Sequence, residues 1–156
     1  MRFFGLTDKG AVRADNQDSF IIEKCGGDEY TAAVLCDGMG GAKAGELASA
    51  LCSREFMSHV TEKLSSKSRK KAEPAQLLRD ACKNANGLAF EYSRFDEAYE
   101  GMGTTLVGGV IRNSGKGYII NVGDSRAYKL SLKSGTITQI TKDHSLVQLL
   151  TESRKR

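Results

Sequence analysis

The first part of the chain contains short apolar runs separated by segments rich in turn residues. In residues 3–7, 19–23 and 30–36 the apolar positions alternate with polar ones or form short unbroken runs. Both patterns are typical of β-strands when they lie between turn signals. We therefore predict one strand in each of these three segments.

The hydrophobic period changes after Gly40 and Gly41. Between residues 44 and 64, apolar side chains recur at helical spacing in a stretch rich in good helix formers. A second such stretch covers residues 77–89, and Pro74 stands where the first turn of a helix accepts proline. The pattern predicts two amphipathic helices, joined by a polar and basic linker at residues 65–71.

Strand patterns return in the last third of the chain, at residues 104–111, 117–122, 127–132 and 137–140. Short turns with Gly, Asn and Ser separate these segments and predict an antiparallel meander. Strands, two helices and then strands again favour an α+β fold with helices on one face of a sheet. A length of 156 residues with 40% hydrophobic content fits a single domain over residues 1–156.

Charge and cysteine usage narrow the functional classes. The net charge of +4 comes partly from clusters at residues 67–71 and 154–156, which lack interleaved aromatic side chains. We therefore expect no nucleic-acid partner. The four cysteines form no CxxC pair, and no signal peptide or apolar run of membrane-spanning length is visible. These features predict a soluble, cytoplasmic protein without a membrane partner.

Candidate chemistry centres on Asp37. An apolar run ends at this carboxylate, and Gly38, Gly40 and Gly41 follow. An Asp-Gly pair is common in tight hairpin turns, which is one interpretation. A carboxylate at a strand end beside glycines is also typical of a site for a metal ion or phosphate, because glycine lets the backbone approach a ligand.

Three more charged residues stand near strand ends. Arg13 and Asp18 precede the second predicted strand, and Asp124 lies in a turn between two later strands. Carboxylates around hard cations, with a guanidinium for phosphate oxygens, are suited to metal-assisted phosphoester hydrolysis. His59 and His144 lack a partner pattern for catalysis, and we expect structural or surface roles for both.

Five segments resemble, in order, the motifs of bacterial protein phosphatase 2C (PPM-type) Ser/Thr phosphatases. They are residues 7–18, residues 37–41 with residues 44–46 behind them, residues 101–105, residues 123–126 and residues 141–145. The resemblance implies two packed antiparallel β-sheets flanked by helix pairs, an α-β-β-α sandwich. It also implies Mn²⁺ or Mg²⁺ as cofactor, and phosphorylated proteins, the targets of a Ser/Thr kinase, as partners.

The resemblance further assigns roles to individual residues. Asp37 would bridge two metal ions, the Gly38 carbonyl would ligate one of them, and Asp18 would hold the same ion largely through water. Arg13 would bind the substrate phosphate, and Asp124 would help to hold an additional metal. A metal-bridging hydroxide would attack phosphoserine or phosphothreonine, with Arg13 and Asp37 as the catalytic residues.

Members of this family continue further and carry Ser-Asp-Gly and Asp-Asn motifs whose aspartates complete the second metal's shell. Neither motif follows Asp124 in this chain. We therefore expect a single phosphatase domain that lacks its carboxy-terminal portion. Two hypotheses stay open: a metal-dependent Ser/Thr phosphatase, or a truncated and catalytically weak module that binds one metal or a phosphorylated partner.

Overall fold

The computed structural model describes residues 2–66 and 73–145. In chain order, the elements are β1 (Asp18–Cys25), β2 (Tyr30–Met39), α1 (Ala42–Ser65), α2 (Pro74–Phe95), the 3₁₀ turn η1 (Glu97–Tyr99), β3 (Gly103–Thr104), β4 (Leu106–Arg112), β5 (Gly117–Val122), β6 (Tyr128–Ser131) and β7 (Thr136–Gln139). Over these described residues, the chain is therefore an α+β protein with two antiparallel sheets and two long helices.

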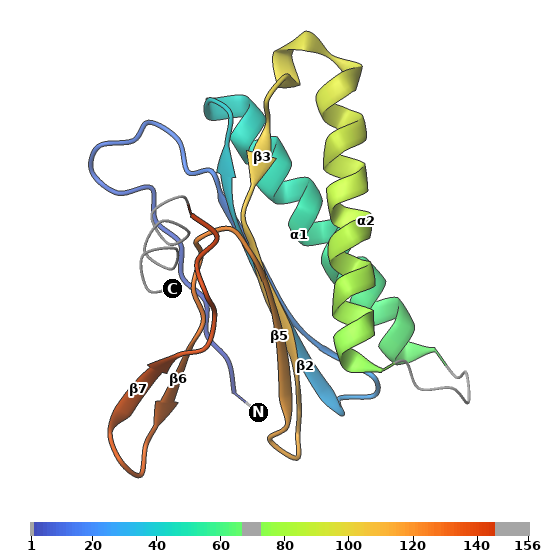
Figure 1. Ribbon diagram of the computed structural model, residues 1–156, viewed down its shortest axis with the longest axis vertical. Helices are drawn as coiled ribbons and strands as arrows, with labels where there is room; N and C mark the ends of the chain where they lie inside the picture. Colours follow the sequence, from blue (N-terminus) through green and yellow to red (C-terminus); the bar gives the residue numbers. More distant parts are fainter. Residues whose placement is uncertain (1, 67–72, 146–156) are drawn as a thin grey trace, which may run out of the picture.

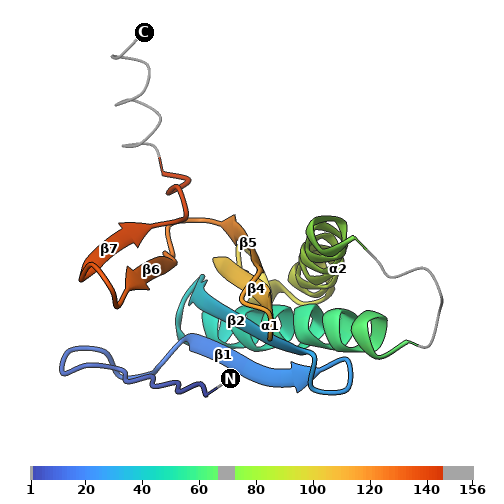
Figure 2. The ribbon, with the colours of Figure 1, turned by 90° about the horizontal axis from the view of Figure 1, so that it is seen from below.

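The larger sheet has the strand order β1-β2-β4-β5, and the short β3 pairs with the end of β2. All its neighbouring strands are antiparallel. Among the described strands, β6 and β7 form the smaller sheet. Both helices lie on one side of the larger sheet, whereas the β6–β7 hairpin and the segment before β1 lie on the other side (Figures 1 and 2).

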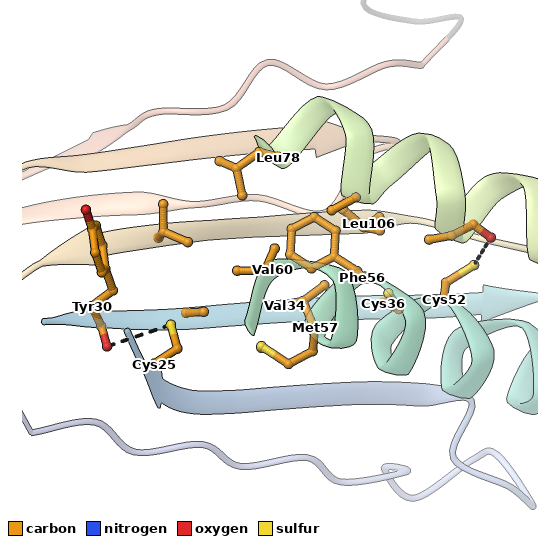
Figure 3. Packing of buried hydrophobic residues seen from close by; sticks show 14 residues of the cluster. Cys25, Tyr30, Val34, Cys36, Cys52, Phe56, Met57, Val60, Leu78 and Leu106 are labelled. Carbon is orange, nitrogen blue, oxygen red and sulfur yellow. Dashed lines mark hydrogen bonds between the residues drawn. The ribbon is translucent and has the colours of Figure 1, made fainter. Parts of the chain in front are cut away.

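The hydrophobic core lies between the helices and the larger sheet. Phe56 and Val60 of α1 are fully buried there, together with Leu78 of α2 (Figure 3). Helix α1 packs on β1 and β2, whereas α2 packs on α1 and reaches β4 and β5. The face of each helix that the sequence pattern marks as apolar is thus the face that covers the sheet.

Alternation along β2 decides which face of the sheet each side chain occupies. Ala32, Val34 and Cys36 are buried against the helices, whereas Leu35 and Asp37 are exposed. Because successive strand residues point to opposite faces, Asp37 projects away from the helices. We call this second surface of the larger sheet the open face.

A groove of about 410 Å³ runs over the open face. Its lining is mainly apolar and includes Phe20, Leu35, Val107 and Ile119 of the sheet and Phe4 of the segment before β1. Neither Asp18 nor Asp37 lines it. The groove is therefore an apolar surface beside the acidic residues and does not contain them.

Most of the predicted elements are present, with two corrections. Residues 3–7 form no strand, and Gly5 instead lies against the ring of Phe20 on the open face. This segment meets side chains of the sheet rather than a backbone edge, so it forms no strand ladder. The meander is also interrupted, because β5 does not pair with β6 and the two hairpins belong to different sheets.

Other sequence predictions concern the helices and cysteines. Helix α2 begins at Pro74, as predicted, and the Glu73 carboxylate caps it by accepting bonds from Ala75 N–H and Gln76 N–H. Cys36 and Cys52 are buried as expected of small hydrophobic residues. Much of the predicted linker, residues 67–71, lies outside the described residues. No helix in the described ranges is long and apolar enough to cross a bilayer.

Candidate metal centre

Asp18 and Asp37 face each other where β1 and β2 meet the open face. They are direct partners in the antiparallel register, Asp18 at the start of β1 and Asp37 near the end of β2. Directly opposed residues share one face of the sheet, with Cβ atoms typically about 4.5–5.5 Å apart. The topology thus brings together two carboxylates that are far apart in the sequence.

Three other predicted site residues act on the Asp37 carboxyl group through their charges. Although Asp37 is exposed as a residue, partial removal of its carboxyl group from water is the first cause of its raised pKa. The negative charge of Asp18 and a hydrogen bond with it follow. Arg13 lowers the pKa of Asp37, and the charge of Asp124 raises it. Asp18, Arg13 and Asp124 therefore all lie within electrostatic reach of Asp37.

The backbone of Asp37 is held by two threonines. Its carbonyl accepts hydrogen bonds from Thr105 N–H (2.9 Å) and Thr104 Oγ1 (3.0 Å). Its N–H donates to Thr105 Oγ1 (3.0 Å). These threonines belong to the 101–105 motif, which by itself predicts no individual role for either of them. These hydrogen bonds, made where β3 pairs with the end of β2, fix the position of Asp37.

Gly38 is required by close packing rather than by an unusual backbone angle. A Cβ atom at this position would overlap the carbonyl group of Gly45 in α1. The Gly38 N–H donates to the Gln17 carbonyl (3.1 Å), just before β1. The end of β2 therefore approaches the first turns of α1 at a distance that no larger residue allows.

Arg13 lies exposed in the loop that leads into β1. Asn16 orders the end of this loop: its Oδ1 accepts from Asp18 N–H (3.0 Å), and its Nδ2 donates to Thr7 Oγ1 (2.8 Å). Asn16 lies within the 7–18 motif, to which the sequence predictions add no separate role for this residue. An Asx-type bond to a residue two places later is a signal that the sequence could have given.

The histidines take no part in the carboxylate pair. His59 Nδ1 accepts a hydrogen bond from Asn84 Nδ2 (2.9 Å), which joins α1 to α2. His144 bonds to the backbone of Gly123, next to Asp124. The structural roles expected for both agree with these contacts.

The donor chemistry fits a hard divalent cation held partly by water. Two opposed carboxylates repel each other, and a cation between them removes that repulsion. Oxygen ligands completed by water are what Mg²⁺ and Mn²⁺ prefer. Within residues 2–66 and 73–145, however, no three His, Cys, Asp or Glu side chains gather closely enough to form a metal cluster.

Comparison with known proteins gives consistent matches. The family model described as "Protein phosphatase 2C" matches residues 10–150. "Serine/threonine phosphatase stp" of Listeria welshimeri is 34% identical over 144 residues, which cover 92% of this chain and 55% of the relative. The chain thus spans about half the length of this curated relative.

Solved structures show the same partial coverage. The structure of Stp1 from Staphylococcus aureus has a TM-score of 0.80 and 36% identity, over 97% of this chain and 57% of that chain. The catalytic domain of PstP, described as in complex with 2 manganese ions, has a TM-score of 0.73 and 32% identity. That match covers 96% of this chain and 58% of the PstP chain.

Proposed function

The chain belongs to the protein phosphatase 2C family, and from that premise we propose that it carries part of the active site of a metal-dependent protein Ser/Thr phosphatase. The observation that carries this proposal is the pairing of Asp18 with Asp37 in register at one edge of the open face. Such a pair is unfavourable by itself and favourable around a divalent cation.

Asp37 and Asp18 provide carboxylate oxygens for the cation site in this proposal, and Gly38 provides its carbonyl. The tight packing of Gly38 on Gly45 supports a fixed backbone at this position. When bound, Mn²⁺ or Mg²⁺ lowers the pKa of a water molecule and neutralises charge on the phosphate. The relative described with manganese ions supports the choice of metal.

Arg13 is the residue we assign to the substrate phosphate. Its charge already acts on Asp37, and its side chain is exposed in a loop beside the carboxylates. A guanidinium can form two parallel hydrogen bonds with phosphate oxygens and stabilises negative charge in the transition state. The substrates we propose are proteins that carry phosphoserine or phosphothreonine and are targets of a Ser/Thr kinase.

A second candidate function is a binding module that holds one metal or a phosphorylated partner without turnover. The observation in its favour is that the described residues include no cluster of three metal-ligating side chains. Asp124 acts on Asp37 through its charge but does not complete such a cluster. A cation held by two carboxylates and water would support binding better than hydrolysis.

We also propose that the open face packs against a second sheet, which would complete the α-β-β-α sandwich of a single phosphatase domain. The apolar groove over the open face supports this arrangement. Apolar surfaces of this kind are normally covered in the native state or used for binding.

The experiment that tests the proposed function measures Mn²⁺-dependent release of phosphate from a phosphothreonine peptide. The 156-residue chain is compared with Asp37→Asn, and circular dichroism verifies that both proteins are folded. Turnover that requires Mn²⁺ and disappears in Asp37→Asn supports the phosphatase. Mn²⁺ binding without turnover supports the binding module, and a folded chain that neither binds Mn²⁺ nor releases phosphate contradicts both.

A further inference from the structure

A second cavity, of about 470 Å³, lies between α2 and the larger sheet, on the side opposite the open face. The strand ends on its wall include Met39 of β2, Thr104 of β3 and Val122 of β5. None of the residues that line the groove on the open face also lines this cavity. Small-molecule sites in proteins typically have volumes of about 300–1,000 Å³ and mainly apolar walls. We call this space the helix-side cavity.

The helix-side cavity lies where two parts of the core do not join. Among the described residues, the buried apolar side chains form two clusters, a larger one that includes Leu106 and a smaller one that includes Met102. Both residues line the cavity, and α2 lines it with the short side chains of Ala85 and Ala89. Unfilled apolar space lowers stability. A ligand in the cavity would recover part of that loss, since ligands that bind only the folded state stabilise it.

Polar groups gather on the α2 side of the cavity. Lys83, Asn86 and Ser93 line it, and their spacing of three and seven residues places them along one face of the helix. Lys83 and Asn86 are exposed, so they lie at the opening rather than inside. Among the described residues, no carboxylate or other acceptor binds the Lys83 ammonium group. The opening therefore offers a positive charge next to mainly apolar walls.

The cavity wall includes residues that hold the backbone around Asp37. Thr104 Oγ1 donates a hydrogen bond to the Asp37 carbonyl (3.0 Å). Met39 follows Asp37 by two positions in β2 and pairs with Gly103 of β3 in the antiparallel register. Both Met39 and Gly103 line the cavity. A molecule in the helix-side cavity would therefore contact the strand ends that hold Asp37.

We propose that the helix-side cavity binds a small organic acid with an apolar body. The apolar body fills the space between α2 and the strand ends, and the carboxylate pairs with Lys83 at the opening. At roughly 30 Å³ for each non-hydrogen atom, as for a water molecule, the cavity accepts a ligand of about 12–15 such atoms. Binding also shifts Asp37 through Thr104, so the ligand and the metal ion change each other's affinity. The binding site is independent of the proposed function, whereas this coupling rests on it.

The first test titrates the 156-residue chain with 4-phenylbutyrate, an aromatic body with one carboxylate, and follows the backbone amide signals by NMR. We expect saturable shifts centred on residues 82–93 and 103–106, the segments that contain most of the cavity lining. The double variant Leu35→Thr/Ile119→Thr, which alters only the groove on the open face, should bind the acid unchanged. Shifts centred on the open face, or no saturable binding, overturn the proposal.

The role of the charge is tested with the neutral 4-phenylbutanamide. It should bind about 2–5-fold more weakly than the acid, as expected for the loss of one exposed ion pair. Lys83→Met keeps a straight side chain without the charge, so it should weaken binding of the acid alone. Lys63→Met, at the exposed end of α1 and outside the cavity, is the matched control and should change neither affinity. Unchanged binding of the acid in Lys83→Met, or an equal loss in Lys63→Met, overturns the proposal.

The role of the space is tested by filling it. Ala89→Leu places a larger side chain in the cavity and should weaken binding of both compounds by about 10-fold or more. Circular dichroism verifies that the variant is folded. Because Lys83 is exposed, Lys83→Met decides the question even where Ala89→Leu does not fold. Unchanged affinity in a folded Ala89→Leu variant overturns the proposal.

The coupling is tested by calorimetric titration with Mn²⁺, with and without saturating 4-phenylbutyrate. We expect the Mn²⁺ affinity to change by about 5-fold or more, the usual size of coupling between two sites. Thr104→Val removes the hydroxyl group that bonds to Asp37, and it should abolish this change while the acid still binds. Lys83→Met at the same acid concentration corrects for direct contact between the carboxylate and Mn²⁺.

An Mn²⁺ affinity that the acid leaves unchanged overturns the coupling. If the unaltered chain binds no Mn²⁺, the proposed function and the coupling fail together. The NMR titration then decides the binding site by itself, so the two failures are distinguishable.

Discussion

At the scale of single residues, the side chain of Asp37 faces two opposing demands. Partial burial first, and then the Asp18 carboxylate opposite it, raise the pKa of Asp37 and make its ionisation costly. A carboxylate must nevertheless be ionised to hold a cation. Its backbone is meanwhile fixed by Thr104 and Thr105. Residues that are held in an unfavourable charge state by rigid surroundings are typical of functional sites.

Replacement of Asp37 by Asn should therefore stabilise the protein in the absence of metal. Because the folded state raises the pKa of Asp37, it holds this proton more tightly than the unfolded state does. The free energy of unfolding then falls as pH rises from the ordinary Asp pKa through the raised one. We expect the free energy of unfolding to rise by about 0.2–1 kcal/mol, the usual size of the interaction between directly opposed side chains in a sheet.

The measurement is urea denaturation in EDTA at pH 7. The control is Asp15→Asn, since Asp15 is also an exposed aspartate but lies in the loop before β1. Added Mn²⁺ should reverse the order, because it stabilises the unaltered protein and has little effect on Asp37→Asn. An Asp37→Asn variant that is less stable than the unaltered protein in EDTA would contradict this account.

Replacement of Gly38 by Ala should destabilise the fold by about 1–3 kcal/mol, because the new methyl group overlaps the Gly45 carbonyl and forces β2 away from α1. Gly87→Ala is the matched control, since no atom lies within 4 Å of its added Cβ in the interior of α2. There we expect a gain of about 0.5–1 kcal/mol. Thermal unfolding of both variants measures these opposite changes in stability. Equal changes in the two variants would show that packing at Gly38 is not tight.

At the scale of elements, α1 and α2 begin in different ways. Helix α1 starts after Gly41, whose φ is 84° and whose N-cap position has no side-chain bond. Helix α2 starts with Pro74 after the Glu73 cap. The glycine entrance of α1 allows the sharp turn from the end of β2 into the helix, which the candidate metal centre needs.

Loss of the Glu73 cap should lower stability without disturbing the site. Glu73→Ala leaves the N–H groups of Ala75 and Gln76 without their side-chain acceptor, at a cost of about 0.5–2 kcal/mol. Glu91→Ala, on the exposed surface of the same helix, should change stability by less than about 0.5 kcal/mol. Urea denaturation followed by circular dichroism compares the two, and equal midpoints would refute the role of the cap.

At the scale of the whole molecule, the two faces of the larger sheet differ sharply. One face is covered by α1 and α2 (Figures 1 and 2). The other face presents the apolar groove, in which Leu35 and Ile119 are each 40% exposed. The carboxylate pair lies at the edge of this second face. The candidate metal centre and the incompletely buried apolar groove therefore lie on the same side of the sheet.

The open face should bind a hydrophobic fluorescent dye. We expect strong dye fluorescence with the unaltered chain, and a clear loss in the double variant Leu35→Thr/Ile119→Thr, because it removes apolar surface from the groove. Thr keeps the β-branched shape that strands favour. Phe95→Ser is the control, since Phe95 is 90% exposed at the end of α2, outside the groove. Equal losses of dye fluorescence in both variants would show that the dye binds outside the groove.

The sequence by itself determined both helices, most of the strands and the family. Helical periodicity and the proline signal located α1 and α2, because local spacing and cap chemistry are properties of neighbouring residues. The five motifs, in order, predicted the protein phosphatase 2C family, which the comparisons confirm. The roles assigned to the site residues stay predictions; these residues are Arg13, Asp18, Asp37, Gly38 and Asp124.

Only the tertiary structure decided which distant residues meet. The register of β1 with β2 opposes Asp18 to Asp37, and the Thr105–Ser125 contact joins the 123–126 loop to that pair. The same tertiary contacts leave residues 3–7 without a strand partner, although their pattern predicts a strand. Pairing between distant segments depends on sheet order and packing against the helices, and the local sequence of either partner does not encode it.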